Sequence, residues 1–295
     1  MSEISAATVK QLRERTGAGM MDCKRALAET NGEMEAAIDL LRTKGLSAAE
    51  KKSGRATADG LIGIAMDGLR GAMVEVNSET DFVARNEIFQ DFVRTVTDLA
   101  LAADGELDAL LSASYPGEKR SVADQLTHMI ATIGENLAIR RATLMAVETG
   151  VVGSYAHAAQ QSGLGKIGVL IGLEGGQAGP DLDQLARNLS MHVAAANPMA
   201  ISHEDLSADV IDREKKIIAE QAAGTGKPEK VIEKIVEGRL AKFYQEVCLL
   251  DQSYVLDTDR TVRQVLDEAS KSLGTPITIK GFERFALGEN VSNPT

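Results

Sequence analysis

The spacing of apolar residues changes at Gly60, and this change divides the chain into parts that must fold differently. Before Gly60 apolar residues recur every three or four positions, as on one face of a helix. After it, residues 62–66 alternate between apolar and other types, and residues 72–76 alternate again. Asp67-Gly68 between these runs predicts the tight turn of an antiparallel hairpin. We therefore expect a helical N-terminal part followed by an α+β core.

The residues before Gly60 predict a small three-helix bundle. The apolar periodicity places helices at residues 8–15, 20–30 and 33–44, separated by turns that contain glycine. Gly45 is expected to end the third helix, because glycine readily adopts the left-handed conformation found there. Residues 47–59 are rich in Ala, Lys and Ser and predict a solvated linker or a frayed helix.

The core shows a weak internal repeat. After the hairpin, long helices are expected at residues 89–103 and 122–133 and a strand at residues 136–147. Residues 150–153 resemble 60–63, residues 166–173 resemble 70–76, and a helix at 181–196 takes the place of the earlier long helix. We interpret these patterns as two related α+β subdomains, each an antiparallel sheet carrying helices. The expected domains are a helical bundle with its linker (1–55), core subdomain N (56–148), core subdomain C (149–200 and 247–295) and an inserted arm (201–246).

The arm is predicted from two highly charged helical segments with narrow apolar stripes, residues 209–222 and 228–246. Pro228 follows a glycine-rich bend and is expected at the first position of the second helix. The pair predicts an antiparallel helical hairpin of coiled-coil type, whose apolar seam is free for a partner or a second copy of the chain.

Phe82 lies in the segment Thr80-Asp81-Phe82-Val83-Ala84, where a strand ends and a helix should begin. Only 3% of the residues are aromatic, so a ring at such a corner is notable. Corners lie at the surface by default, because their backbone groups need water, and an exposed ring there would be an anchor for a partner's pocket. The alternative is that Phe82 folds back into the core beneath the helix.

No motif predicts catalysis or a cofactor. Residues 163–168 match the glycine pattern of dinucleotide-binding loops, but they precede a strand instead of a helix. Residues 221–228 resemble a phosphate-binding loop without its first glycine and its Ser or Thr. The four histidines lack metal-ligand spacing, and His192 is expected to be a core residue. We therefore expect no enzyme, no metal site and no cofactor.

Composition limits the partners and the compartment. The net charge of −11 opposes direct binding of nucleic acid, which needs a basic surface. The sequence contains no run of 18 apolar residues, so no membrane span is predicted. Cys23 and Cys248 lie far apart among apolar residues and are expected to be buried reduced thiols. The N-terminus has no secretory pattern, so a cytoplasmic location is expected.

Several motifs resemble the bacterial elongation factor Ts family. The two longest are Thr16-Gly17-Ala18-Gly19-Met20-Met21-Asp22-Cys23-Lys24 and Val76-Asn77-Ser78-Glu79-Thr80-Asp81-Phe82-Val83-Ala84. Shorter ones are Ile133-Gly134-Glu135-Asn136, Met191-His192-Val193-Ala194-Ala195 and Val236-Glu237-Gly238-Arg239. The resemblance runs from Ser2 to about Glu289.

The resemblance implies a nucleotide-exchange factor in translation elongation. Its partner would be the GTPase elongation factor Tu, in its GDP-bound and nucleotide-free forms, from which it displaces Mg²⁺ so that GDP leaves and GTP rebinds. It also implies a ubiquitin-associated-like N-terminal bundle, a two-part α+β core and a helical arm. Family members often carry a further C-terminal helix, which the turn-rich residues 288–295 do not predict.

The resemblance also implies roles for individual residues. Four residues of the core corner would dislodge the partner's Mg²⁺, with Phe82 as the intruding ring: Thr80, Asp81, Phe82 and Val83. Further partner contacts would come from the bundle, the core and the second subdomain: Arg13, Met20, Met21, Lys24, Ile133, Gly134, His157 and Val247. Two other functions stay open on the residues alone: a passive adaptor or holdase that leaves nucleotide affinity unchanged, and an enzyme built around residues 163–168. A homodimer or a 2:2 complex through the arm is a further expectation.

Overall fold

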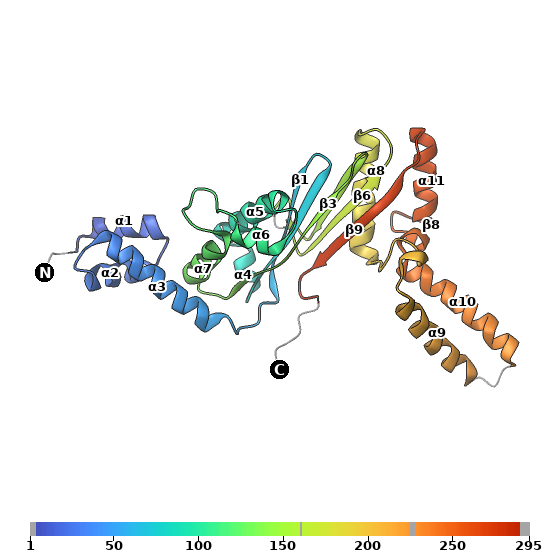
Figure 1. Cartoon of the computed structure of the whole chain (residues 1–295), viewed down its shortest axis with the longest axis horizontal. Coiled ribbons are helices and arrows are strands. Elements are labelled where there is room, and N and C mark those ends of the chain that lie inside the picture. Colours follow the sequence, from blue (N-terminus) through green and yellow to red (C-terminus); the bar gives the residue numbers. More distant parts are fainter. Residues whose placement is uncertain (1–3, 160, 225–227, 290–295) are drawn as a thin grey trace.

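The computed structural model describes residues 4–159, 161–224 and 228–289, and shows N-terminal helices followed by antiparallel sheets that carry helices (Figure 1). The helices are α1 (Ala6–Thr16), α2 (Met20–Glu29), α3 (Met34–Lys52), α4 (Asp81–Ala84), α5 (Glu87–Ala102), α6 (Leu107–Ser112), α7 (Val122–Ile133), α8 (Pro180–Ala196), α9 (Ala208–Ala223), α10 (Glu229–Val247) and α11 (Val262–Leu273). The short 3-10 helices are η1 (His203–Asp205) and η2 (Leu249–Asp251). The strands are β1 (Asp59–Asp67), β2 (Arg70–Ser78), β3 (Leu137–Ala146), β4 (Val151–His157), β5 (Leu164–Gly165), β6 (Ile167–Glu174), β7 (Ser253–Tyr254), β8 (Asp257–Thr261) and β9 (Thr278–Ala286).

The three predicted N-terminal helices are present, but the third is longer than expected. The hydroxyl of Ser5 caps α1 by accepting from the Thr8 amide, and Gly17 ends it in the left-handed region with φ 65°. The prediction that Gly45 ends α3 is wrong, because the helix continues to Lys52. A Cβ on Gly45 would lie 3.2 Å from the Ala131 Cβ, so this glycine allows α3 to pack closely on α7. Tertiary packing therefore outweighs the local signal for a helix end.

The core has four layers: helices, sheet, sheet and helices (Figure 1). The first sheet has the strand order β3-β2-β1-β5, and the second has the order β4-β6-β9. One face of the first sheet packs against α5, α6 and α7, and its other face meets the second sheet through apolar side chains such as Ile62, Met73 and Leu170. Helices α8 and α11 cover the remaining face of the second sheet. Both faces of β2 are consequently buried along almost its whole length.

The predicted hairpin is confirmed, and its register is regular. Asp67 of β1 pairs with Arg70 of β2, which leaves a two-residue loop at Gly68-Leu69. The pairing of β2 with β3 has a β-bulge at Glu75/Val76, and that of β6 with β9 has one at Gly172/Leu173. Strands β1, β2 and β3 of the first sheet and β4, β6 and β9 of the second thus pair in antiparallel succession, and in both sets the bulge lies between the second and third strands.

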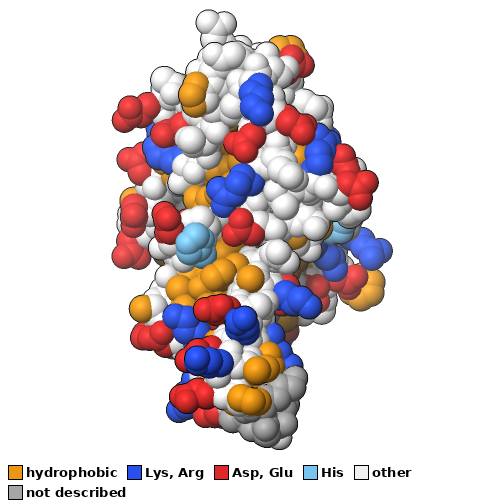
Figure 2. All heavy atoms as spheres, turned by 90° about the vertical axis from the view of Figure 1, so that its right-hand side faces the viewer, with side chains coloured by type: hydrophobic (Ala, Val, Ile, Leu, Met, Phe, Trp, Pro, Cys, Tyr) orange, Lys and Arg blue, Asp and Glu red, His pale blue; other side chains and the backbone are white. Residues whose placement is uncertain are grey.

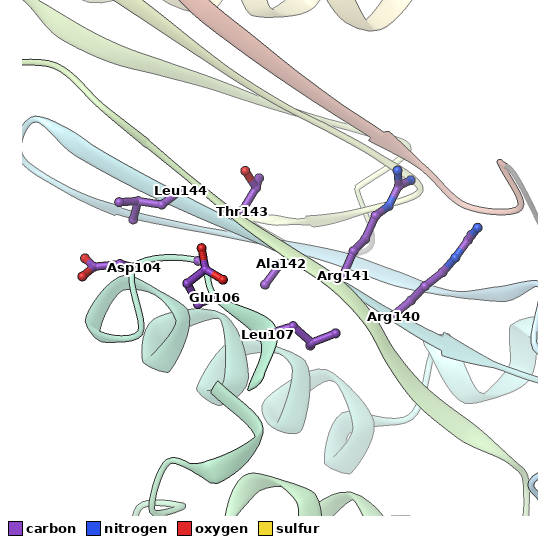
Figure 3. A pocket seen from close by; sticks show the side chains of 9 residues that line it. Asp104, Glu106, Leu107, Arg140, Arg141, Ala142, Thr143 and Leu144 are labelled. Carbon is purple, nitrogen blue, oxygen red and sulfur yellow. The ribbon is translucent and has the colours of Figure 1, made fainter. Parts of the chain in front are cut away.

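Strand β3 forms one edge of the first sheet, and Gly105 packs directly against its backbone. A Cβ on Gly105 would lie 2.5 Å from the Leu144 nitrogen, and the residue has φ +74°. The loop that carries Gly105 borders a pocket of about 390 Å³ beside this edge (Figure 3). Acidic Asp104 and Glu106 lie at one end of the pocket, and the basic residues of β3 lie at the other. The glycine therefore lets the loop cover an edge strand that would otherwise offer unpaired backbone groups.

Gly105→Ala is expected to destabilise the protein by about 2–4 kcal/mol, because backbone strain at positive φ adds to a clash with β3. The matched control is Gly117→Ala, since Gly117 also has positive φ, +77°, but no atom lies within 4 Å of its added Cβ. This control should cost only about 1 kcal/mol. Urea unfolding followed by circular dichroism measures both; equal losses would contradict the close approach.

Helices α9 and α10 pack on each other and project as an arm from the side of the core that carries α11 and β8 (Figure 1). Ile218 and Ala222 are buried along their contact. The prediction that Pro228 is the first helical residue is wrong by one position: it is the N-cap, with ψ 148° outside the helical range. Most of the predicted bend, residues 225–227, lies outside the described residues. No helix in the described ranges is long and apolar enough to cross a membrane.

The predicted core roles of Cys23, Cys248 and His192 are confirmed. Both thiols are free and buried, and burial together with Asp251 raises the pKa of Cys248 to about 11. The fully buried His192 accepts a hydrogen bond at Nδ1 from the Val255 amide (3.2 Å), so its Nε2 carries the proton and donates to Gln252 Oε1 (2.9 Å). The imidazole is therefore held as one neutral tautomer.

Stability is expected to fall as the pH drops below about 6.5, the ordinary pKa of histidine. Burial lowers the pKa of His192, and burial with nearby Arg120 lowers that of His128. In this range the unfolded chain binds protons that the folded chain does not, so acid favours unfolding. Melting temperatures measured from pH 7.5 to 5 should show this fall, and His192→Asn should reduce it. His128→Gln measures the contribution of His128 in the same way. If the fall of the melting temperature with pH is unchanged in both variants, the assignment of this fall to the two histidines is contradicted.

Candidate functional site

Phe82 projects into solvent from the corner between β2 and α5. Its side chain is 76% exposed, whereas the next two residues, Val83 and Ala84, are 6% and 3% exposed. All three belong to the single turn of α4, and successive helical residues point in different directions. The burial of Val83 and Ala84 therefore turns Phe82 outward, and of the two expected arrangements the exposed ring is the one found.

A reciprocal pair of interactions braces this corner. The backbone N–H and the hydroxyl of Thr80 both donate to the carboxylate of Glu135, at 3.0 and 2.6 Å. In return the backbone N–H of Asn136 donates to the carboxylate of Glu79, at 2.6 Å. The Thr80 residue occupies the N-cap position of α4, yet its hydroxyl does not cap the helix because it bonds to Glu135. The corner is thus fixed to the turn between α7 and β3.

The same turn carries two predicted partner contacts. Ile133 is the last residue of α7 and is half-buried, and the exposed Gly134 ends the helix with φ 91°. Because Glu135 follows directly, the brace brings this turn next to Thr80. The structure therefore places the corner and the Ile133–Gly134 turn in one surface.

The brace extends to the end of the N-terminal helices. The side-chain amide of Asn136 donates to the Arg55 carbonyl at 2.9 Å, and the Arg55 guanidinium lies 3.4 Å from the Glu79 carboxylate. The segment that follows α3 is thereby attached to the corner.

A second polar chain connects the corner with the region of His157. Gln90 of α5 donates to the Ala84 carbonyl at 2.8 Å, and Gln161 donates to Gln90 at 2.5 Å. The exposed His157 ends β4, four residues before Gln161, and its Nδ1 lies 3.2 Å from the Tyr155 hydroxyl. Two glutamines thus link α4 to Gln161, which lies four positions from His157 in the sequence.

Exposed side chains near Phe82 add charge and apolar area. Asp81 lies 3.4 Å from Arg85 one turn later, an exposed pair of small energetic weight. Ile88, at the start of α5, is 56% exposed. Sequence reasoning did not single out Ile88, although its position six residues after Phe82 places a second apolar side chain on the same short segment.

The predicted bundle contacts lie apart from the corner, on α1 and α2. Arg13, Met20, Met21 and Lys24 are all exposed, and the two methionines begin α2. None of the four lines the groove of about 740 Å³ between the N-terminal helices and α7. Figure 1 shows α1 and α2 at one end of the molecule, separated from α4 by the length of α3.

Val247 lies on a third surface at the base of the arm. This half-buried residue ends α10, and its carbonyl accepts from the amide of the exposed Met199 at 2.8 Å. Figure 2 views this end of the molecule and shows hydrophobic side chains gathered above the arm. The predicted residues therefore lie in three regions of the molecule. Among the described residues, hydrogen bonds connect predicted segments with one another only in the corner region.

The glycine pattern at residues 163–168 precedes a strand, as the sequence predicted. Residues 163–168 contain β5 and the start of β6, so the glycine pattern precedes strands and no helix follows it. Within the described ranges, no three His, Cys, Asp or Glu residues are grouped as metal ligands.

An exposed ring on a braced corner, with further exposed apolar side chains at both ends of a long body, defines a protein that acts by binding another protein. The family described as Elongation factor TS matches residues 79–289. The chain is 56% identical to elongation factor Ts of Rhodospirillum rubrum, over 99% of this chain and 94% of that protein. It is 52% identical to the protein of Rhodospirillum centenum, over 100% of this chain and 96% of that one. It is 55% identical to that of Sphingopyxis alaskensis, with coverage of 99% and 94%.

The chain belongs to the elongation factor Ts family.

Proposed function

We propose that the Phe82 corner is the element with which this family member opens the nucleotide site of elongation factor Tu. As a family member the chain is a cytoplasmic nucleotide-exchange factor for that GTPase, not an enzyme. The observation that carries the proposal is an aromatic ring held 76% exposed on a corner fixed by hydrogen bonds. The factor binds the GDP form, dislodges Mg²⁺ with residues 80–83, and releases GDP so that GTP can rebind.

Thermodynamic coupling explains how a contact outside the nucleotide site can expel GDP. A GTPase holds its nucleotide through a phosphate-binding loop and a Mg²⁺ ion with near-octahedral geometry. A factor that prefers the empty GTPase must weaken nucleotide binding by the same free energy by which nucleotide weakens binding of the factor. A rigid ring that displaces partner helices by about an ångström disturbs the near-octahedral arrangement of ligands that Mg²⁺ demands. The ring therefore acts on the metal indirectly.

The required free energy indicates that Phe82 does not act alone. Accelerating GDP release by about four decades needs roughly 5.5 kcal/mol, at 1.36 kcal/mol per decade. One buried aromatic anchor contributes about 2–4 kcal/mol. The remaining free energy is assigned to the other proposed contacts, which are Arg13, Met20, Met21, Lys24, Ile133, Gly134, His157 and Val247.

Within the corner the four residues have different tasks. Phe82 and Asp81 face the partner, since their side chains are exposed and partly exposed. Val83 is buried and anchors the turn in the core, and Thr80 is bonded to Glu135. The last two therefore support the ring from behind.

We also propose the domain division 1–55, 56–148, 149–200 with 247–295, and 201–246. The equivalent β-bulges in the two sheets, each between the second and third strand, support two related α+β subdomains. The N-terminal bundle is ubiquitin-associated-like, and α9 with α10 forms a coiled-coil arm. The exposed Ile217 and Val231 on these helices support an arm that contacts the partner or a second copy in a homodimer or 2:2 complex.

Release of a fluorescent GDP analogue from elongation factor Tu tests the proposed function. The factor at micromolar concentration should accelerate release by orders of magnitude, and no acceleration would contradict the function. Binding of the factor should also be weaker to the GDP-bound than to the nucleotide-free GTPase. Equal affinities would favour the passive adaptor or holdase instead.

A further inference from the structure

We propose that Glu135 is a positioning residue for nucleotide exchange: it holds the Phe82 corner in the orientation that exchange requires. This inference rests on the proposed function of Phe82. Glu135 acts through Thr80, to which both of its carboxylate oxygens are bonded.

The turn that carries Phe82 has little intrinsic rigidity. Helix α4 contains four residues and has no side-chain cap. An isolated helical turn is unstable, because nucleation fixes several backbone angles for very few hydrogen bonds. Burial of Val83 and Ala84 sets the side of the chain that faces the core, but these residues lie after the ring. The segment before the ring must be fixed by something else.

Glu135 supplies that restraint from a different element. Its carboxylate accepts the Thr80 N–H at 3.0 Å and the Thr80 hydroxyl at 2.6 Å. Hydrogen bonds to an ionised carboxylate are shorter and stronger than those between neutral groups. Two bonds to one residue fix both its backbone position and its side-chain rotamer. Thr80 is separated from Phe82 by one residue, so this restraint acts directly on the base of the ring's turn.

The restraint is reciprocal, and this makes the corner and the α7–β3 turn one unit. Glu79 accepts a hydrogen bond from the backbone N–H of Asn136 at 2.6 Å. Two neighbouring residues of the corner are therefore bonded to two neighbouring residues of the turn. The Ser78 hydroxyl adds a bond to the Thr80 carbonyl at 2.9 Å. A ring that acts as a wedge must transmit force to its partner, and a mobile base would yield instead. Loss of Glu135 should therefore impair exchange more than it impairs binding.

The expected result concerns the maximal rate of GDP release at saturating factor. Glu135→Ala should lower this rate by about tenfold or more, because two charge-assisted bonds are lost. The concentration of factor that gives half-maximal rate should change much less, about threefold at most, since the exposed contacts remain. Glu135→Gln should restore most of the rate, because its amide oxygen accepts from the Thr80 N–H and its NH₂ group donates to the hydroxyl.

Two comparisons separate positioning from general damage. Asp267→Ala removes an exposed carboxylate from α11, which lies far from α4 and contains none of the proposed partner contacts, and should leave the maximal rate unchanged. In a Phe82→Ala background, Glu135→Ala should cause no further loss, since its effect passes through the ring. A melting curve for each variant monitors folding. Should Glu135→Ala not fold, Thr80→Val, which removes only the hydroxyl bond, must show an intermediate loss that also disappears without Phe82.

The outcomes distinguish the inference from the proposed function. A wild-type maximal rate in Glu135→Ala, or an equal loss with and without Phe82, overturns the positioning role while the exchange function stands. A Glu135→Gln variant as slow as Glu135→Ala also overturns it. Absence of acceleration by the wild-type factor, in contrast, overturns the proposed function itself.

Discussion

Replacement of Phe82 by alanine is expected to slow factor-stimulated GDP release by about 30- to 900-fold. This range corresponds to the loss of about 2–4 kcal/mol, typical of an aromatic anchor at the centre of an interface. The free energy of unfolding should change by no more than about 0.5 kcal/mol, because the ring is 76% exposed and contributes little to the core. The variant thus separates partner action from folding.

Matched variants test whether the effect belongs to this ring. Leu69→Ala removes an exposed apolar side chain from the β1–β2 turn and should leave release unchanged. Ile88→Ala, beside the corner, should have a smaller effect than Phe82→Ala. Release of a fluorescent GDP analogue measures all three, with urea unfolding as the control for stability. A Phe82→Ala variant that is fully active, or one that loses its cooperative unfolding, would contradict the proposed role.

Exposure of Phe82 could not be decided from its own position in the sequence. The ends of the strand and helix predicted a corner, but either the ring or its neighbours could have faced the core. Burial of Val83 and Ala84 in the core between the first sheet and its helices decides the matter, and this core includes residues as distant in the sequence as Met129 and Ile130. The resemblance to a family favoured the exposed ring, whereas local periodicity alone did not.

The brace behind the ring was not predictable from periodicity. Glu79, Glu135 and Asn136 lie in turns, where polar residues are expected for many reasons. Their significance depends on which two turns meet in space, and an antiparallel sheet of unknown strand order does not specify this. Helix α3 illustrates the same limit, since Gly45 lies inside the helix where it packs closely against α7.

Sequence reasoning predicted the alternating apolar residues of β2 but not the burial of its other face. Met73 and Glu75 lie on the face opposite Ala72, Val74 and Val76, where solvent would be expected in a sheet with one buried side. The second sheet covers this face, so Glu75 is fully buried. Packing of one sheet against the other thus converts a position that would ordinarily face solvent into a fully buried carboxylate.

Glu75 is stabilised by two arginines that a β-bulge brings to the same side. Because Glu75 pairs with Arg141 and the next pair is Val76 with Ile139, Arg140 is the extra residue of the bulge. Arg141 Nε lies 2.6 Å and Arg140 Nη1 lies 3.2 Å from the Glu75 carboxylate.

Arg141 extends this buried charge cluster to the second sheet. Its guanidinium lies 4.0 Å from the centre of the Phe285 ring and donates to the Ala286 carbonyl at 3.4 Å. Cation–π contact and the hydrogen bond both depend on the orientation that Glu75 imposes. The Glu75 carboxylate therefore helps to hold the two sheets together as well as β2 and β3.

Glu75→Ala is expected to lower the free energy of unfolding by about 3–5 kcal/mol, because removing one member of a buried ion cluster leaves the others without compensation. The arginine side chains retain 26% and 28% exposure, so water offsets part of the loss and favours the lower end of that range. Glu75→Gln should cost less, because the amide oxygen still accepts one hydrogen bond. Urea unfolding followed by circular dichroism gives each value.

An exposed ion pair provides the comparison for Glu75. Glu118 lies 2.8 Å from Arg120, and both side chains reach solvent, so Glu118→Ala should cost less than about 1 kcal/mol. Adding Arg141→Ala to Glu75→Ala should destabilise less than the sum of the two single changes, since the second removes a charge that the first left unpaired. Strict additivity, or a loss at Glu75 no larger than at Glu118, would show that the cluster does not join the sheets. The free energy then has to reside in the apolar contacts between them.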